Sequence, residues 1–101
     1  MGVGEQKAVI FSEKAKIELN QIGDYITEKG YPETGYNYSR RIFELCLTLG
    51  TMPEKYPICR HKRFNRWNYH CAIFEQTYTI VYKIDAQVVT VKRILHGKLL
   101  K

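Results

Sequence analysis

The sequence predicts an α+β protein in which a helical hairpin packs on one face of an antiparallel sheet. Two amphipathic segments, residues 13–29 and 32–49, repeat their apolar side chains at helical spacing. The second half of the chain is instead rich in aromatic and β-branched residues, which favour strands. Since both kinds of element have an apolar face that needs a cover, helices and sheet are expected to bury one another. The strand segments are residues 63–75, 77–84 and 88–95.

The chain begins with a short strand that leads into the first helix. Residues 7–11 favour β-structure and end at Ser12, a good helix N-cap. Glu13 follows in the first turn, where the helix dipole favours an acid. Gly30 is expected to stop the helix. Its apolar stripe consists of Ala15, Leu19, Ile22 and Ile26, with Tyr25 beside it.

The second helix is expected to begin at Pro32, because proline suits the first helical position. Gly50 and Pro53 mark its end. Its stripe has the same spacing as that of the first helix, so the two helices are expected to form a hairpin. The stripe consists of Tyr38, Ile42, Leu45 and Leu49, widened by Phe43 and Cys46.

Polar breaks at residues 75–76 and 85–87 predict tight turns between three antiparallel strands. In the middle strand, successive side chains are expected to point to opposite faces of the sheet. Its first set is Tyr78, Ile80, Tyr82 and Ile84, and its second set is Thr79, Val81 and Lys83.

Length and composition bound the class of protein. A chain of 101 residues with 45% hydrophobic content can fill one modest core, so residues 1–101 are expected to form a single domain. No apolar run approaches the roughly 20 residues of a membrane helix, and the first ten residues lack the apolar stretch of a secretion signal. The protein is therefore expected to be soluble and cytoplasmic, with no membrane partner. Nothing in the sequence specifies its oligomeric state.

The cysteines are expected to be reduced and to serve in packing. Three cysteines are an odd number, and the chain shows no export signal. Zinc is not expected, because adjacent strand residues such as His70 and Cys71 point to opposite faces. Cys59 and His61 do not have the spacing of a usual zinc half-site either. No metal or other cofactor is predicted.

Positive charge gathers in the second half of the chain. The net charge is +6, yet residues 55–101 carry ten Lys and Arg against only Glu75 and Asp85. Such a field attracts phosphate backbones or acidic protein partners. A plain role in solubility is the alternative.

The densest basic cluster precedes and enters the first of the three strands. Its guanidinium and ammonium groups could neutralise phosphates, while Trp67 or Tyr69 could stack on an unpaired base. The alternative is a basic sheet edge that discourages aggregation or receives an acidic partner. The candidate target-binding residues of this cluster are His61, Lys62, Arg63, Arg66 and His70.

A second polar cluster ends the chain and includes Arg93, His96 and Lys98. If Val89, Val91 and Leu95 face the core, Arg93 shares their side and needs a partner there, in an ion pair or in a site. His96 lies at a strand end, where an imidazole can act as a general acid or base near neutral pH. An ordinary solvated histidine is the alternative.

The element order, the segment 52–57 and the closing Arg93-Ile94-Leu95-His96-Gly97 resemble the toxins of the bacterial RelE/ParE superfamily. The resemblance spans roughly residues 9–98. It implies a toxin of a type II toxin–antitoxin module, held inactive by a cognate antitoxin that is expected to be acidic. It also implies His96, Arg93 and Tyr82 as candidate catalytic residues, and Lys98 as a further target-binding residue.

Two mechanisms remain open within this superfamily. RelE-type toxins cut messenger RNA on the ribosome, and ParE-type toxins poison DNA gyrase by protein contact without chemistry of their own. Thr79 stands where many RelE-like nucleases carry an arginine, whereas the Arg93 to Gly97 ending resembles ParE. The basic cluster would suit a ribosome. Whether the protein is an enzyme is therefore left open, and a non-toxic basic binding module that keeps the fold is the alternative function.

Overall fold

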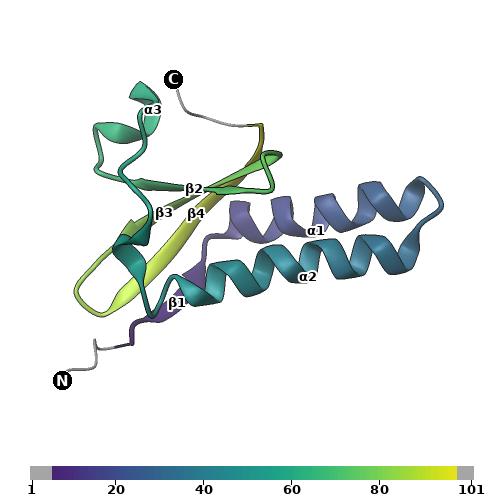
Figure 1. Cartoon of the computed structure of the whole chain (residues 1–101), viewed down its shortest axis with the longest axis horizontal. Coiled ribbons are helices and arrows are strands. Elements are labelled where there is room, and N and C mark those ends of the chain that lie inside the picture. Colours follow the sequence, from purple (N-terminus) through teal and green to yellow (C-terminus); the bar gives the residue numbers. More distant parts are fainter. Residues whose placement is uncertain (1–5, 98–101) are drawn as a thin grey trace.

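The computed structural model describes residues 6–97, and its elements follow the predicted order (Figure 1). A strand and a helical hairpin come first, and three strands close the chain. The elements are β1 (Ala8–Phe11), α1 (Glu13–Glu28), α2 (Pro32–Thr48), the 3-10 turn η1 (Pro53–Lys55), α3 (Lys62–Asn65), β2 (His70–Phe74), β3 (Tyr78–Ile84) and β4 (Val88–His96).

The four strands form one mixed sheet in the order β1-β4-β3-β2. β4 runs parallel to β1 and antiparallel to β3, while β3 and β2 are antiparallel. Glu75 and Gln76 both have positive φ, 49° and 62°, and the Thr77 amide donates to the Phe74 carbonyl across them. This is the tight two-residue turn that the polar break predicts.

The helical hairpin covers one face of the sheet, which is called the inner face below. Ser12 caps α1, since its side chain accepts a hydrogen bond from the Ala15 amide. Gly30, at φ 98°, ends it. The helices approach closely where Gly35 faces the Gly23 carbonyl, because a Cβ on Gly35 would lie only 2.6 Å from that oxygen. The tip at which α1 joins α2 projects beyond the sheet (Figure 1).

The inner core lies between the hairpin and the sheet. Both predicted helical stripes contribute to it, and so does the predicted set from Tyr78 to Ile84 on β3. Phe43 and Tyr25 are the exceptions, because they are 39% and 59% exposed. The buried members are Ala15, Ile22, Ile42, Cys46, Leu49, Ala72, Phe74, Ile80, Tyr82, Val89, Val91 and Ile94.

A smaller cluster covers part of the opposite, outer face of the sheet. Its buried side chains, here called the outer cluster, are Cys59, Phe64, Cys71 and Val81. A β-bulge lies in β4, where Val81 pairs with Arg93 but Tyr82 pairs with Val91. The bulge changes which residues share a face.

Because of that bulge, Leu95 packs against the outer cluster, whereas Val89 and Val91 lie in the inner core. Our expectation that Val89, Leu95 and Arg93 share one side of β4 is therefore wrong. Arg93 lies directly opposite Val81, on the outer side.

Two further expectations need correction. Residues 63–69 are not strand: His61 caps the short helix α3, and Asn68 adopts a left-handed φ of 59°, so β2 begins only at His70. The cysteines are not all reduced thiols either, since Cys59 and Cys71 form a disulfide and only Cys46 is free. The odd number of cysteines did not reveal this pair, because two of the three are brought together by an isolated β-bridge between Ile58 and His70.

Between residues 6 and 97, no helix has both the length and the apolar character needed to cross a membrane. The same part of the chain contains no group of three or more His, Cys, Asp or Glu side chains that could hold a metal ion.

Candidate target-binding surfaces

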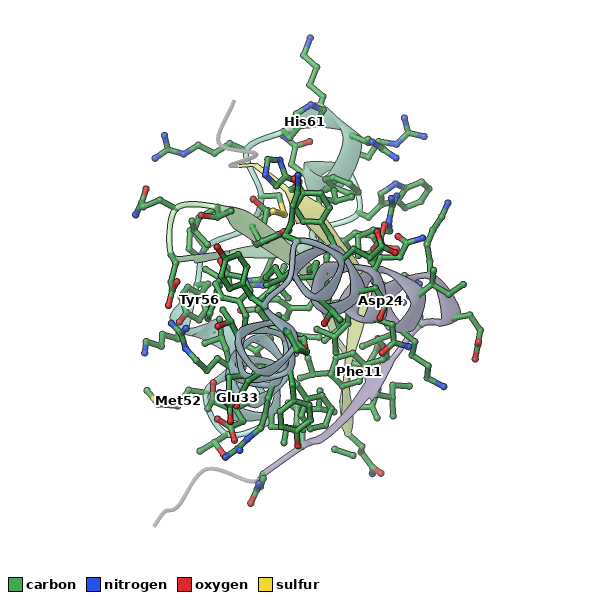
Figure 2. All side chains as sticks on the ribbon, turned by 90° about the vertical axis from the view of Figure 1, so that its right-hand side faces the viewer. Phe11, Asp24, Glu33, Met52, Tyr56 and His61 are labelled. Carbon is green, nitrogen blue, oxygen red and sulfur yellow. A yellow bond between two sulfur atoms is a disulfide. The ribbon has the colours of Figure 1, made fainter. Side chains whose placement is uncertain are left out.

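The predicted basic cluster forms a loop on the outer face, residues 60–69, here called the basic loop. His61 begins α3, and its Nδ1 accepts a hydrogen bond of 3.1 Å from the Arg63 amide. The Asn65 side chain donates to the Arg60 carbonyl at 3.1 Å. These short-range bonds fold the loop on itself. Seen along the hairpin, His61 and Met52 lie at opposite ends of the molecule (Figure 2).

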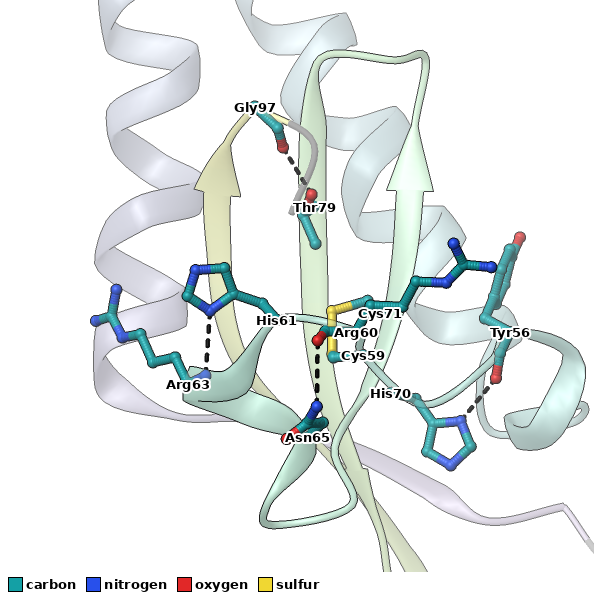
Figure 3. The surroundings of a disulfide bond; sticks show 10 residues. All are labelled: Tyr56, Cys59, Arg60, His61, Arg63, Asn65, His70, Cys71, Thr79 and Gly97. Atoms are coloured by element: carbon teal, nitrogen blue, oxygen red, sulfur yellow. Dashed lines mark hydrogen bonds between the residues drawn. A yellow bond between two sulfur atoms is a disulfide. The ribbon is translucent and has the colours of Figure 1, made fainter. Parts of the chain in front are cut away.

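The basic loop is held at its base by backbone bonds and by the disulfide. The Cys59 amide donates to the Tyr69 carbonyl at 2.8 Å, and the Cys71 amide donates to the Pro57 carbonyl at 3.1 Å. The Cys59–Cys71 bond joins the incoming chain to β2, on the face of the sheet away from the helices (Figure 3). Phe64 packs over this base.

Cations and aromatic rings alternate on the basic loop. Lys62, Arg63 and Arg66 are exposed. The Arg66 guanidinium lies 4.9 Å from the centre of the Trp67 ring, which is itself 56% exposed. An exposed ring beside guanidinium groups can bind a planar or an anionic partner. Three of the predicted target-binding residues therefore lie on one open surface, and His61 is half-buried beside them.

His70 does not belong to this surface. Its Nδ1 lies 2.6 Å from the Tyr56 carbonyl oxygen, and its ring stacks on Tyr82 at 5.3 Å. His70 therefore packs against neighbouring residues at the start of β2 and does not face the basic loop. The prediction of a target contact for His70 has no support in this arrangement. Lys98 lies outside the described residues.

Tyr82, a candidate catalytic residue, is completely buried in the inner core. Its hydroxyl donates to the Pro53 carbonyl at 2.6 Å. Burial raises the pKa of this hydroxyl well above its ordinary value of 10.0. A phenol in this position holds η1 against the sheet, and it has no path to a substrate in this conformation.

Arg93 is engaged in a partly buried ion pair. Its Nε and Nη2 donate to one carboxylate oxygen of Glu18, at 2.9 and 2.7 Å, and the other oxygen accepts the Ile94 amide at 2.8 Å. β1 stops at Phe11, opposite Val91, so the Glu18 carboxylate takes the place of the missing strand at the edge of β4. Of the two roles that the sequence left open for Arg93, this geometry fits a structural ion pair.

His96 is the only exposed member of the candidate catalytic set. Its ring packs edge-on against Tyr78, with centres 5.3 Å apart. It pairs with Tyr78, four residues along β3 from Tyr82, a separation of roughly 13 Å at strand geometry. The fully buried Thr79 donates to the Gly97 carbonyl at 2.6 Å beside it. The structure therefore does not bring His96 and Tyr82 together in one site.

Sequence reasoning missed a second surface, on the helical hairpin. A groove of about 430 Å³ runs between α1 and α2. Tyr36, Phe43 and Leu47 on α2 follow helical spacing, and their side chains are 65%, 39% and 43% exposed. The signal in the sequence is this second apolar row on α2, but we expected Phe43 in the buried stripe instead. The helix groove is defined here by its apolar lining: Leu19, Tyr36, Phe43 and Leu47.

The chain is a small basic α+β protein with an exposed basic loop on its outer face and an apolar groove on its hairpin. Residues 9–99 match the family described as ParE toxin of type II toxin-antitoxin system, parDE. The chain belongs to this ParE toxin family, which confirms the predicted superfamily and its place in type II toxin–antitoxin systems. No curated protein sequence matches the chain.

Two solved structures share the fold. One, described as the chromosomal ParDE TA system from P. aeruginosa, superposes with a TM-score of 0.78 at 14% identity, covering 94% of this chain and 100% of that one. The other, the toxin–antitoxin complex RelBE2 from Mycobacterium tuberculosis, gives 0.64 at 19% identity, covering 90% and 91%. Both branches of the superfamily thus have this architecture, so the fold alone leaves the mechanism open.

Proposed function

We propose that this ParE-family toxin acts by binding rather than by cleavage, with DNA gyrase as its target and the basic loop as its contact surface. One observation carries the proposal: the candidate catalytic residues are dispersed. Tyr82 is buried, Arg93 is paired with Glu18, and only His96 faces solvent. General acid–base cleavage of RNA needs positioned partners around one phosphate. A single exposed imidazole does not supply them.

The basic loop supports the binding half of the proposal. Its exposed cations are Lys62, Arg63 and Arg66, and the Arg66 guanidinium lies over the exposed Trp67 ring. Arginine and tryptophan are the residues that most often dominate the energy of protein interfaces. Positive charge also speeds encounter with an acidic surface or with protein-bound DNA. A gyrase–DNA complex offers both kinds of partner.

The antitoxin is proposed to occupy the helix groove. An amphipathic helix binds by placing its apolar face in such a groove, anchored at i, i+3, i+4 and i+7. The groove's volume of about 430 Å³ and its exposed Tyr36, Phe43 and Leu47 side chains suit that mode. Both surfaces are open at once, so an antitoxin with an acidic segment can reach the basic loop as well.

The mechanism is tested with purified DNA gyrase and relaxed plasmid. The toxin is expected to raise the amount of cleaved plasmid trapped by detergent. Arg63→Ala combined with Arg66→Ala should weaken this effect about tenfold or more, because two interface arginines are lost. Lys14→Ala combined with Lys29→Ala is the matched control: it removes the same charge from exposed positions on the hairpin and should change nothing.

A parallel reaction tests cleavage directly, by primer extension on a messenger RNA in cell-free translation. Codon-phased cuts that disappear in His96→Ala would overturn the binding mechanism and favour a RelE-type nuclease. Harmless overexpression of the folded protein, together with no effect on gyrase, would favour the non-toxic binding module instead.

The antitoxin site is tested by co-expression with the protein encoded next to the toxin. Leu47→Glu places a charge in the helix groove and should leave the toxin active but no longer neutralised. Ile17→Glu is the control, since Ile17 is 54% exposed and does not line the groove. Full neutralisation of both variants would exclude the groove as the antitoxin site.

A further inference from the structure

We propose that the Cys59–Cys71 disulfide is a thiol–disulfide exchange site whose reduction releases the basic loop from the outer face. The consequence for target binding rests on the proposed function of that loop. The release itself is a property of the fold and can be measured without any target.

The disulfide closes the basic loop at its base. Cys59 precedes the loop and Cys71 lies in β2, with a sequence separation of 12 residues (Figure 3). The other ties at the base are the two backbone hydrogen bonds that form the bridge between Ile58 and His70. One covalent bond therefore joins the two ends of the segment that carries the exposed arginines.

The outer cluster depends on the same two residues. Of its four buried side chains, two are the cysteines themselves, and the others are Phe64 and Val81. Val81 is anchored in β3, between two neighbouring strands. Phe64 is thus the main buried apolar group that the loop brings to this face. Once the bond is broken, little buried surface remains to hold the loop down.

The inner core is independent of this bond. Its members include Cys46 but neither Cys59 nor Cys71. The pairing of β2, β3 and β4 is likewise made by backbone hydrogen bonds. Reduction is therefore a local event, in which the loop opens while the hairpin and the sheet stay folded. For a loop of this length, a cross-link changes the opening equilibrium by on the order of a hundredfold.

The reaction is a two-electron exchange with a dithiol. A thiolate of the reductant attacks one sulfur of the pair, which forms a mixed disulfide and releases the other sulfur as a thiolate that takes up a proton. The second thiol of the reductant then resolves the mixed disulfide. Cys59 and Cys71 end as thiols, and the reductant ends as a cyclic or protein disulfide. A toxin that acts on gyrase shares its compartment with such dithiols.

Cys46 provides an internal contrast. It is fully buried in the inner core, and burial raises the pKa of its thiol to about 12. Because the thiolate is the reactive form, Cys46 is expected to stay inert in the folded protein. Exchange is therefore assigned to the pair on the outer face, whose cysteines are themselves only 3% and 6% exposed and meet the reductant as the loop opens.

The first measurement counts thiols by alkylation and intact mass, in denaturant, on protein purified without reductant. One alkylated cysteine is expected, and three after treatment of the folded protein with dithiothreitol. Three alkylated cysteines before any reduction would overturn the proposal, because the pair would then not be bonded. A bond that dithiothreitol breaks only after denaturation would overturn it too, because such a bond is purely structural.

The second measurement is hydrogen exchange of the same full-length protein with and without dithiothreitol. Amides of the basic loop, such as Asn65 and Tyr69, should exchange on the order of a hundredfold faster after reduction. Amides shared by β3 and β4 should not change. The double variant Cys59→Ala/Cys71→Ala should resemble the reduced protein, and Cys46→Ala should respond to dithiothreitol as the wild type does. Unchanged loop exchange on reduction would overturn the proposal.

Gyrase inhibition is then compared in the two redox states. Inhibition that falls on reduction, together with faster loop exchange, supports both the exchange site and its effect on target binding. If loop exchange responds but gyrase is never inhibited, the proposed target is wrong and the exchange site stands. Equal inhibition in both states, despite a released loop, would overturn the regulatory consequence.

Discussion

The two faces of the sheet are built in different ways. The inner face is covered by the helical hairpin and shares a continuous apolar core with it. The outer face carries only the outer cluster, whose four buried apolar side chains include two disulfide-bonded cysteines. Stability is therefore concentrated on the inner face, while the exposed cations and the Trp67 ring lie on the outer one. Loosely held elements can adapt to a partner without unfolding the molecule.

β3 makes this comparison within one strand. Ile80 and Val81 are adjacent and both completely buried, yet Ile80 belongs to the inner core and Val81 to the outer cluster. Equal burial therefore has different consequences: Ile80 contributes to the core of the whole fold, whereas Val81 packs against a single loop. Four predictions test that division, from the largest expected effect to the smallest.

Ile42→Ala should destabilise the whole protein by about 2–5 kcal/mol, because it leaves a cavity in the inner core. Ile42 is completely buried on α2, whereas Ile17 on α1 is 54% exposed. Ile17→Ala is therefore the control and should change the unfolding free energy by less than about 0.5 kcal/mol. Urea unfolding measures both. Equal losses would contradict the assignment of global stability to the inner core.

Arg93→Met should destabilise the protein by about 2–4 kcal/mol, since it leaves the Glu18 carboxylate largely buried without its cation. The two side chains are 20% and 15% exposed. The double variant Arg93→Met/Glu18→Gln should recover part of the loss, because a neutral amide oxygen can still accept the Ile94 amide. Urea unfolding of both variants decides the matter. A double variant no more stable than the single one would contradict this account.

The sequence predicted most of the fold because each element carries its own local signal. Ser12 and Gly30 mark the limits of α1, and the alternation from Tyr78 to Ile84 correctly separates the two sides of β3. The bulge at Lys92 has no such signal, since it depends on how β3 and β4 register. That one extra residue moved Leu95 and Arg93 to the outer side, contrary to expectation.

The candidate site was less predictable, because residue type does not reveal partners. Arg63 and Arg66 were grouped in one basic cluster and lie together on the exposed basic loop, although the strand predicted from residue 63 begins only at His70. Tyr82 was a candidate from the family resemblance and His70 from its place in the basic cluster, but their rings stack on each other and both side chains contact backbone carbonyls. The disulfide was missed because it joins residues that only tertiary structure brings together.

Phe64→Ala should lower the global unfolding free energy by only about 1–2 kcal/mol, less than a core phenylalanine normally costs. Phe64 is 6% exposed, but it packs in the outer cluster, whose loop can open separately. Hydrogen exchange of the basic loop should accelerate while exchange in β3 stays slow. A loss as large as that of Ile42→Ala, with faster exchange throughout, would show that the two faces unfold together.

The smallest effect concerns the pH dependence of the inner core. Burial raises the pKa of the Cys46 thiol from its ordinary value of 9.0 to about 12. Above pH 9 the unfolded chain loses this proton while the folded chain retains it, so the unfolded state binds fewer protons. Stability from this group is therefore complete below pH 9 and is lost as pH rises from 9 toward 12.

Between pH 8 and pH 10 this loss should amount to about 1 kcal/mol, and Cys46→Ala should remove it. Tyr78 and Tyr82, whose pKa values burial also raises, have ordinary values of 10.0 and therefore begin to titrate in the unfolded chain within this window, so the difference between the wild-type and Cys46→Ala curves isolates the thiol. Urea unfolding without reductant gives both curves, and the disulfide keeps Cys59 and Cys71 from titrating. Parallel curves for the wild type and the variant would mean that the Cys46 thiol is solvated, and that the inner core is less tightly closed than its burial indicates.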